Sequence, residues 1–491
     1  MEFRIDRESG TPLYRQLETT LREQIQSGAL APDTRLPSSR ELAGRLGVNR
    51  VTVTNAYADL EADGLLYSLH GSGTYVSPPI KGLEKRQPGA LEEWPVWQSE
   101  AYRRSRPFNG LDIDEMMARA RRPGVITFAP GVSDSSLFRT DEFRKVLQLV
   151  LQRDGVEALE YGDRRGYPAL RKTIASILAS QGIPANPDDV LITSGSQQAL
   201  LITAGALLRP GDSVLVEAPT YSTALELFSA LGARIIGVPV DEKGMQVEQV
   251  ESLIRAHHPR LIYTIPNFQN PTGACLSGHR RRELAALARR WEVPVVEDDF
   301  VGDLRYEGRA QPALKSLDTH GDVIYISSFS KMLMPGLRLG YIVANGPVYE
   351  ALIAQKRIND LNTSNFSQRA VEAYITVGRY RAHLRRACQF YSRRRDTFMA
   401  ALTREMPPEV RWMPPQGGLF VWLELPPALT WERLLPAAVD EGVAFMPGSP
   451  FFPDGSGRSC MRLNFTLHPS EVIDTGVRRL ARVIRRFLNR L

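Results

Sequence analysis

The stretch Ile326–Tyr341, "ISSFSKMLMPGLRLGY", contains the lysine on which the interpretation of this chain depends. Lys331 follows a run of small hydroxyl residues, and Arg338 comes after it, behind a Pro-Gly turn. The preceding segment, "DVIYISS", is apolar and predicts a buried strand. A lysine in such an uncharged run is not typical of a solvated surface, so the surrounding residues must indicate its role.

The composition is typical of a globular protein with more than one domain, because 43% of the 491 residues are hydrophobic and 24% are charged. Three cysteines, Cys275, Cys388 and Cys460, are far apart in the sequence, which argues against a disulfide framework and against a zinc site. The amino terminus lacks an apolar signal segment, and no stretch approaches the length of about 18 apolar residues that spans a membrane. We therefore expect a cytoplasmic protein without a metal or a membrane span.

Residues 1–77 have the spacing of a helix-turn-helix unit followed by a hairpin. Leucines recur at helical intervals in "TPLYRQLETTLREQIQSGAL", and Gly28 ends that helix. A short second helix is predicted over "SSRELAGRLG", and Asn49 caps a third helix that buries Val53 and Tyr57. Two short strands with a glycine-rich turn, a wing, are predicted in "LLYSLHGSGTYV". The alternative is a small helical packing unit that binds no ligand.

Charge is distributed unevenly along the chain. The whole chain carries +6, but residues 1–77 contain eight arginines, no lysine and ten acidic residues, a net charge of −2. Arg35, Arg40, Arg45 and Arg50 fall in a short span with a single acidic residue. A local positive face is therefore predicted within a domain that is acidic overall.

Residues 1–77 resemble the winged-helix domain of the GntR regulators in "LPSSRELA", in "GVNRVTVTNAYADLEADG" and in "HGSGTYV". The resemblance implies binding to double-stranded DNA. The chemistry agrees, because arginine and hydroxyl side chains at the start of a helix can reach phosphates and base edges in the major groove. The positions that the resemblance assigns to DNA contacts are Arg40, Asn49, Arg50, Thr52 and His70.

Residues 78–122 are predicted to be a linker. They mix prolines, both charge signs and two tryptophans without a clear period. The segment is longer than most connections within a domain, which favours a tether between two domains.

Residues 123–491 alternate between apolar extended segments and amphipathic helices. The extended segments include "DSVLVEAP", "RLIYTIP", "VPVVEDD" and "DVIYISS", and the helices include "SQQALLITAGALL" and "HRRRELAALARRW". This order predicts an α/β domain with a mostly parallel sheet covered by helices. In such sheets ligands bind at the carboxyl ends of the strands, and there the polar runs "SGSQQ", "NPTG", "EDD" and "SSFSK" fall.

This location gives Lys331 a chemical role. Burial and nearby cations lower the pKa of a lysine, and a neutral amine can form a Schiff base with an aldehyde. Ser196, Ser328 and Arg338 can hold a phosphate, and Asp298 can pair with a protonated pyridine nitrogen, as pyridoxal 5'-phosphate requires. Each residue alone has an ordinary alternative, such as a solvated lysine, a loop cap or a surface ion pair. Their combination favours the cofactor.

Residues 125–491 resemble the fold-type I aminotransferases through "YGDRRGYPALR", "TSGSQQAL", "PNFQNPTG", "EDDF", "SSFSKMLMPGLRLGY" and "MRLNF". The resemblance implies a large domain with a mostly parallel sheet and a smaller α+β domain over about 375–491. It makes Lys331 the lysine that binds pyridoxal phosphate and Asp298 the partner of the pyridine nitrogen. The other cofactor contacts that it implies are Tyr161, reaching over from a second subunit, and Gly195, Ser196, Gln197, Tyr221, Asn270, Phe300, Ser328 and Arg338.

Three of these positions carry specific expectations. By the resemblance, Tyr221 would stack on the cofactor ring and Asn270 would donate to its phenolic oxygen, while Arg462 would bind the carboxylate of an effector or substrate. Phe300 departs from the family, which usually has a tyrosine there. The missing hydroxyl argues against full transaminase turnover.

Nearly the whole chain thus resembles the MocR/GabR-type regulators, which join a GntR winged helix to an aminotransferase-like domain. The resemblance implies a domain-swapped homodimer that regulates transcription. Its effector would be pyridoxal phosphate itself or an amino compound that forms an external aldimine with it. The alternative is an active class I/II aminotransferase with a structural or vestigial N-terminal domain, and a half-reaction of transamination fits either hypothesis. Arg462 indicates a carboxylate ligand, and no residue indicates its identity, the target genes or the sign of the response.

Overall fold

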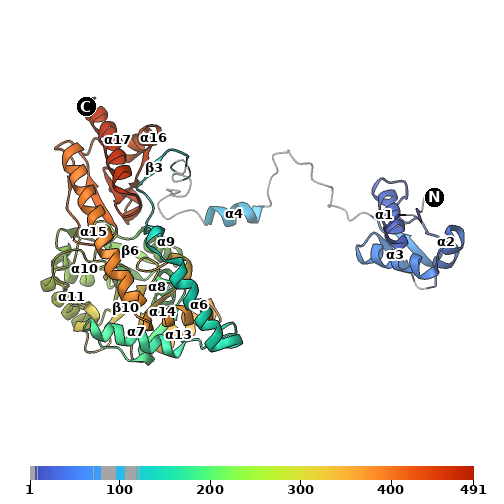
Figure 1. Cartoon of the computed structure of the whole chain (residues 1–491), viewed down its shortest axis with the longest axis horizontal. Helices are drawn as coiled ribbons and strands as arrows, with labels where there is room; N and C mark the ends of the chain where they lie inside the picture. Colours follow the sequence, from blue (N-terminus) through green and yellow to red (C-terminus); the bar gives the residue numbers. More distant parts are fainter. Residues whose placement is uncertain are drawn as a thin grey trace. The chain divides into compact units, whose positions relative to one another are not determined.

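The computed structural model describes residues 6–7, 9–69, 71–78, 96–104, 118, 120 and 122–490. The chain divides into two compact units, Met1–Ser99 and Glu100–Leu491 (Figure 1). In the part of the chain that is described, no helix is long and apolar enough to cross a membrane. The predicted linker lies largely outside the described residues, but one helix, α4 (Val96–Arg104), falls within it and was not predicted.

The N-terminal unit is the predicted winged helix-turn-helix. Ser38 caps the second helix by accepting a hydrogen bond from the Glu41 amide at 3.2 Å, and Asn49 caps the third by accepting one from the Val51 amide at 3.0 Å. Gly47 turns the chain between them with a left-handed φ of 61°. The elements are α1 (Leu13–Gln26), α2 (Ser39–Leu46), α3 (Arg50–Ala62) and an antiparallel hairpin of β1 (Leu66–Leu69) and β2 (Gly73–Val76).

The larger unit is built on an eight-stranded sheet. Its central strands run parallel, which confirms the predicted mostly parallel sheet. No sequence pattern indicated that two strands run in the opposite direction. These are β11, which is antiparallel to both of its neighbours, and β7, which is antiparallel to β6. In spatial order the strands are β4 (Val190–Thr193), β11 (Gly340–Val343), β10 (Val323–Ser328), β9 (Val295–Asp299), β8 (Leu261–Thr264), β5 (Ser213–Ala218), β6 (Arg234–Asp241) and β7 (Gly244–Met245).

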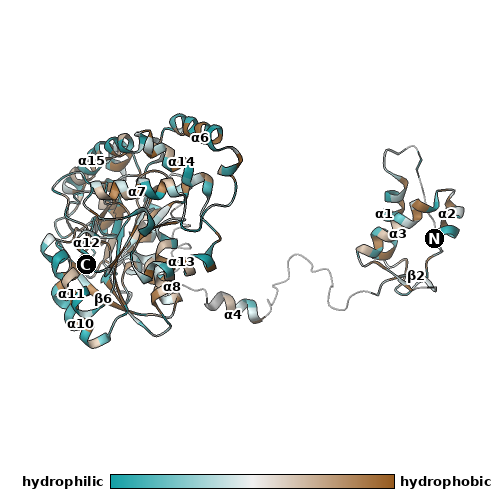
Figure 2. Ribbon diagram, turned by 90° about the horizontal axis from the view of Figure 1, so that it is seen from below, coloured by the Kyte–Doolittle hydropathy of each residue, from teal (hydrophilic) through white to brown (hydrophobic). Residues whose placement is uncertain are grey.

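Helices cover both faces of this sheet. The alternating side chains of β4 point to opposite faces of the sheet. Leu191 packs in the apolar cluster that includes residues of α8, whereas Val190 and Ile192 pack in the cluster that includes residues of α7. The outer turns of α10 and α11 are hydrophilic (Figure 2). The helices are α6 (Thr140–Asp154), α7 (Pro168–Ser180), α8 (Ser196–Leu207), α9 (Ser222–Ala230), α10 (Val250–His257), α11 (Gly278–Trp291), α12 (Leu314–Leu317), α13 (Pro347–Asn359) and α14 (Asn365–Thr376).

A smaller α+β part follows in the sequence, as predicted, and α15 (Arg379–Glu405) extends into it from the large sheet (Figure 1). One strand of this part comes from far upstream: β3 (Ile126–Thr127) pairs in parallel with β14 (Val443–Ala444). Phe128, just after β3, is fully buried in the same core. The remaining elements are the antiparallel strands β12 (Arg411–Trp412), β13 (Phe420–Glu424), β15 (Met446–Pro447) and β16 (Cys460–Asn464), and the helices α16 (Trp431–Asp440) and α17 (Ser470–Leu488).

Candidate functional site

Lys331 lies just beyond the carboxyl end of β10, at the edge of the sheet where ligands bind. The main-chain carbonyl of Lys331 accepts a hydrogen bond from Ser133 Oγ at 2.8 Å, which holds the lysine against the segment after β3. Burial, followed by the guanidinium groups of Arg462 and Arg338, lowers the pKa of Lys331 to about 8. A substantial fraction of this amine is therefore neutral, and nucleophilic, near physiological pH.

Asp298, in β9, has the features of a partner for a cationic nitrogen. Its side chain is 4% exposed, and Oδ2 accepts a hydrogen bond from the Tyr263 hydroxyl at 2.9 Å. Oδ1 is buried and has no hydrogen-bond partner among the described residues. Burial raises the pKa of Asp298 to about 7. A protonated pyridine nitrogen would satisfy the orphan oxygen and restore the charged form.

The predicted phosphate contacts gather around the start of α8. Gly195 has a φ of 109°, and a Cβ there would lie 3.0 Å from Arg338 Nη2, so glycine lets the arginine approach the backbone. Arg338 Nη2 also donates to the Ser194 carbonyl at 2.9 Å. Gln197 Oε1 is buried without a hydrogen-bond partner among the described residues. The free N–H groups at the start of a helix, together with a guanidinium, form a suitable site for a phosphate.

Arg462, in β16, is buried and already partly engaged. Nη1 donates to Asn270 Oδ1 at 2.9 Å and Nη2 donates to the Ala129 carbonyl at 2.8 Å, while Nε has no partner among the described residues. The guanidinium carbon lies 4.1 Å from the centre of the Phe420 ring. Burial lowers the pKa of Arg462 to about 9. Because the bond occupies the Asn270 carbonyl, the amide of Asn270 stays available as a donor, the role predicted for it.

Three predicted cofactor residues occupy different environments. Tyr221 occupies the N-cap position of α9 without a side-chain capping bond and is half-buried, and burial raises its pKa. Phe300 is 8% exposed and packs in the same apolar cluster as Val301 and Leu304. Tyr161 is 82% exposed, so its side chain is not part of a buried pocket of its own chain.

Three residues near the proposed site were not predicted. Tyr263 donates a hydrogen bond to Asp298. It is a hydroxyl-bearing residue within the apolar run "LIYTIP", and this position was the feature of the sequence that could have indicated its role. Ser133 contacts Lys331 across 198 positions of sequence, and no local pattern marks such a contact. Thr220, next to Tyr221, is the third, and only the structure marks it, because its Oγ1 is buried without a partner among the described residues.

The predicted DNA contacts lie at the starts of α2 and α3. Arg40, Asn49 and Arg50 are exposed, and Thr52 is half-buried. Arg50 Nε donates to Ser39 Oγ at 3.2 Å, which links the first turns of the two helices. His70 lies outside the described residues. Val51, which was not predicted, is 61% exposed and places an apolar side chain at the start of α3.

The two units place the chain in a class of proteins that join a winged-helix DNA-binding domain to a fold-type I aminotransferase fold. Residues 131–480 match the family described as aminotransferase class I and II, and residues 13–76 match the bacterial regulatory proteins of the gntR family. The chain belongs to the class I and II aminotransferase family and carries a GntR domain in addition. This is the architecture of the MocR-type regulators, which confirms the resemblance.

Relatives with and without the N-terminal unit are similar to this chain. The uncharacterised HTH-type transcriptional regulator YisV of Bacillus subtilis is 31% identical over 99% of both chains. Aromatic-amino-acid aminotransferase 1 of Thermococcus litoralis is 36% identical over 82% of this chain and 98% of its own. A similar solved structure is that of LysN, an α-aminoadipate aminotransferase from Thermus thermophilus complexed with N-(5'-phosphopyridoxyl)-L-leucine. It is 35% identical in sequence, with a TM-score of 0.75, and the match covers 80% of this chain and 100% of LysN.

The class I and II aminotransferase fold family depends on pyridoxal phosphate. The residues present fit that group: Asp298 Oδ1 lacks a partner, Gly195 leaves room beside Arg338, and Lys331 has a lowered pKa.

Proposed function

We propose that the chain is a pyridoxal-phosphate-dependent transcription regulator. It binds double-stranded DNA through the winged helix, and its larger unit binds the cofactor and senses the cofactor itself or an amino compound that reacts with it. The observation that carries the proposal is the cofactor cluster of Lys331 and Asp298 on the same chain as an exposed arginine face at α2 and α3. When a DNA-binding domain and a ligand-binding domain are joined in one chain, ligand binding can change the affinity for DNA.

Each group of residues has a defined part in this function. Lys331 would hold the cofactor covalently, and Asp298 would hold its ring nitrogen in the protonated form. The cofactor, when bound, supplies an aldehyde carbon that reacts with amines. Tyr221 would stack on the ring. The phosphate would take its hydrogen bonds from Gly195, Ser196, Gln197, Ser328 and Arg338.

Arg462 would select effectors that carry a carboxylate. Its fork already binds Asn270 and the Ala129 carbonyl, so an incoming carboxylate would use Nε or displace one of these bonds. Such an exchange couples effector binding to Asn270, and through the amide of Asn270 to the cofactor. The proposed effector class is therefore the amino acids and related amino carboxylates.

We also propose that the chain works as a domain-swapped homodimer in which Tyr161 reaches the cofactor of the partner subunit. Apolar side chains around Tyr161 support this, because Val156 and Leu159 are 67% and 68% exposed. Ile358 and Leu361, at 76% and 65%, add to the exposed apolar surface. Apolar side chains exposed to this extent would be covered by a second subunit that packs on this part of the chain.

The proposal is tested by measuring whether the state of the cofactor site changes DNA binding. We expect the affinity for the DNA upstream of the chain's own gene to differ by about 5- to 150-fold, or about 1–3 kcal/mol, between apo, cofactor-loaded and amino-acid-treated protein. Fluorescence anisotropy with a labelled duplex and a panel of α-amino acids measures the difference. Identical affinities and identical footprints in all three states would contradict the sensor function.

A second candidate function is an active aminotransferase. The complete phosphate set, Asn270 and Arg462 favour it, and the Thermococcus litoralis relative carries the name of such an enzyme. A coupled turnover assay with several amino donors and keto acids separates the two functions, because a sensor completes at most one half-reaction.

Phe300→Tyr tests why turnover would be absent. A tyrosine hydroxyl would donate to the phenolic oxygen of the cofactor beside Asn270 and draw electron density from it. The pKa of the protonated link between cofactor and Lys331 should then fall by about one unit, since one hydrogen bond contributes about 1 kcal/mol and one pKa unit corresponds to about 1.4 kcal/mol. Spectrophotometric titration of both proteins measures this pKa. An unchanged or raised value would show that Phe300 serves only the packing of the apolar cluster.

A further inference from the structure

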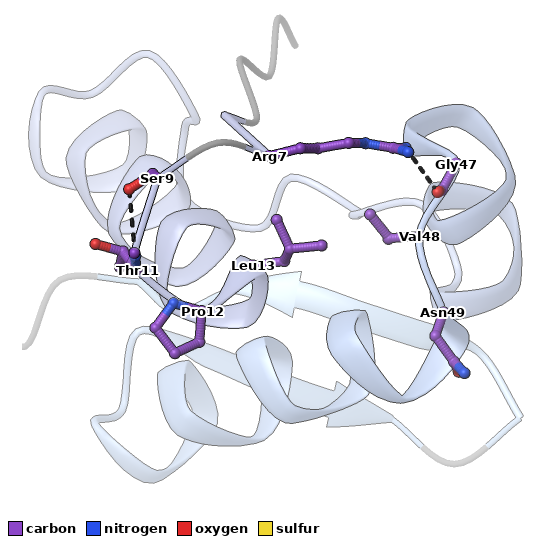
Figure 3. A pocket seen from close by; sticks show the side chains of 9 residues that line it. Arg7, Ser9, Thr11, Pro12, Leu13, Gly47, Val48 and Asn49 are labelled. Carbon is purple, nitrogen blue, oxygen red and sulfur yellow. Dashed lines mark hydrogen bonds between the residues drawn. The ribbon is translucent and has the colours of Figure 1, made fainter.

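The winged-helix unit has a surface pocket beside the turn that joins α2 to α3 (Figure 3). Its volume is about 460 Å³. One wall is the segment before α1, with Arg7, Ser9 and Thr11, and the other is the turn itself, with Gly47 and Asn49. Of the described residues that are predicted to contact DNA, Asn49 alone lines this pocket.

Gln16 holds two of the described residues before α1, Asp6 and Thr11. The side-chain amide of Gln16 donates to the Asp6 carbonyl at 2.9 Å and to the Thr11 carbonyl at 2.8 Å, and its Oε1 accepts from the Asp6 amide at 3.0 Å. Ser9 Oγ accepts a hydrogen bond from the Thr11 amide at 3.2 Å. These bonds hold the backbone at Asp6, directly before Arg7, and at Thr11.

Arg7 reaches across the pocket to the turn. Its Nη2 donates to the Gly47 carbonyl at 2.9 Å (Figure 3). Within the described part of the chain, the N–H groups of Nε and Nη1 have no acceptor. A guanidinium presents five N–H donors in a fixed fork, so one bond to the turn leaves the others for a ligand.

The chemistry of the pocket fits an oxyanion. Its lining carries a guanidinium and two hydroxyl groups, and Asn49 also borders it, with a side-chain oxygen already used in the cap of α3. None of the described lining residues is acidic. The pocket also borders the start of α3, and the first residues of a recognition helix lie against the bases in the major groove. The oxyanion that occurs at this place in a protein–DNA complex is a phosphate of the DNA backbone.

We propose that Arg7 binds a backbone phosphate of the DNA beside the recognition helix α3. Its bond to Gly47 links that contact to the turn from which α3 begins, so the same side chain anchors the DNA and sets the orientation of the helix that reads it. This inference rests on the proposed DNA-binding function and adds a contact to it.

Arg7→Gln and Arg7→Lys test the inference in the full chain. Anisotropy titrations with the upstream duplex, from about 50 to 200 mM salt, give the slope of log K against log salt concentration. Arg7→Gln should weaken binding to all duplexes by the same factor and reduce the magnitude of that slope by about 0.9, because one phosphate contact is lost. Arg7→Lys should retain the slope. Arg15→Gln, an exposed arginine in α1 that does not line the pocket, is the matched control and should change neither quantity.

Circular dichroism on each variant separates loss of folding from loss of contact, and Arg7→Lys keeps the test valid if Arg7→Gln unfolds. Weaker binding of folded Arg7→Gln with an unchanged slope would assign Arg7 a structural role only and overturn the inference. Unchanged affinity would overturn it too. A wild-type chain that binds no DNA would overturn both this inference and the proposed function, whereas normal wild-type binding with an unaltered Arg7→Gln slope would overturn this inference alone.

Discussion

Lys331→Ala is expected to abolish the covalent attachment of pyridoxal phosphate and the visible absorption band that accompanies it. The lysine lies beyond the end of β10 at the proposed cofactor site, with a pKa lowered to about 8 by burial and by Arg462 and Arg338. No other side chain of the cluster is an amine, so nothing replaces it. In wild-type apo protein the rate of attachment should rise with pH through about 8, because only the neutral amine attacks the aldehyde.

Absorption spectra after addition of the cofactor measure the first effect, and stopped-flow traces across the pH range measure the second. Lys172→Ala is the control, since Lys172 is exposed on α7 and should leave the band unchanged. Borohydride reduction followed by peptide mapping should label Lys331. Label on a different lysine would show that the cofactor site is wrongly assigned.

The sequence predicts where the proposed cofactor cluster lies in the fold, because its residues stand at the ends of apolar strands. Four polar runs follow four extended segments, and parallel strands bring such ends to one edge of a sheet. The sequence therefore predicts that Asp298 and Lys331 lie near each other. The capped helices of the N-terminal unit were equally predictable, because a cap such as Asn49 and its helix are adjacent in sequence.

Contacts between distant segments could not be predicted in the same way. The bond from Ser133 to Lys331, the pairing of β3 with β14 and the engagement of Arg462 by Asn270 each depend on how the smaller part packs on the sheet. The reversal of β11 depends on the connection over residues 329–339, which returns the chain antiparallel beside β10. No sequence pattern indicated the role of Arg7, because its hydrogen-bond partner, Gly47, is 40 positions away in the sequence.

Substitution of Arg40 or Arg50 by alanine is expected to weaken specific DNA binding by about 1–3 kcal/mol for an arginine that reads a base. Both residues are exposed at the starts of α2 and α3, in a span that carries positive charge within an acidic domain. Arg50 donates Nε to Ser39, which orients its guanidinium and leaves the two terminal nitrogens for a base or a phosphate.

The two possible roles of each arginine differ in what its loss changes. An arginine that reads guanine should, when removed, relax discrimination at one base pair and leave the salt dependence nearly unaltered. An arginine that holds a phosphate should weaken binding to all sequences alike and reduce the salt slope by about 0.9. Arg50, as the first residue of the recognition helix, is expected to behave in the first way, and Arg40, at the start of the preceding helix, in the second.

Anisotropy titrations of Arg40→Ala, Arg50→Ala and the control Arg15→Ala, against the upstream duplex and single-base variants at several salt concentrations, resolve these effects. Unchanged affinity in both variants at matched salt would refute the assignment of α3 as the recognition helix, and with it the positive face predicted from the arginine spacing.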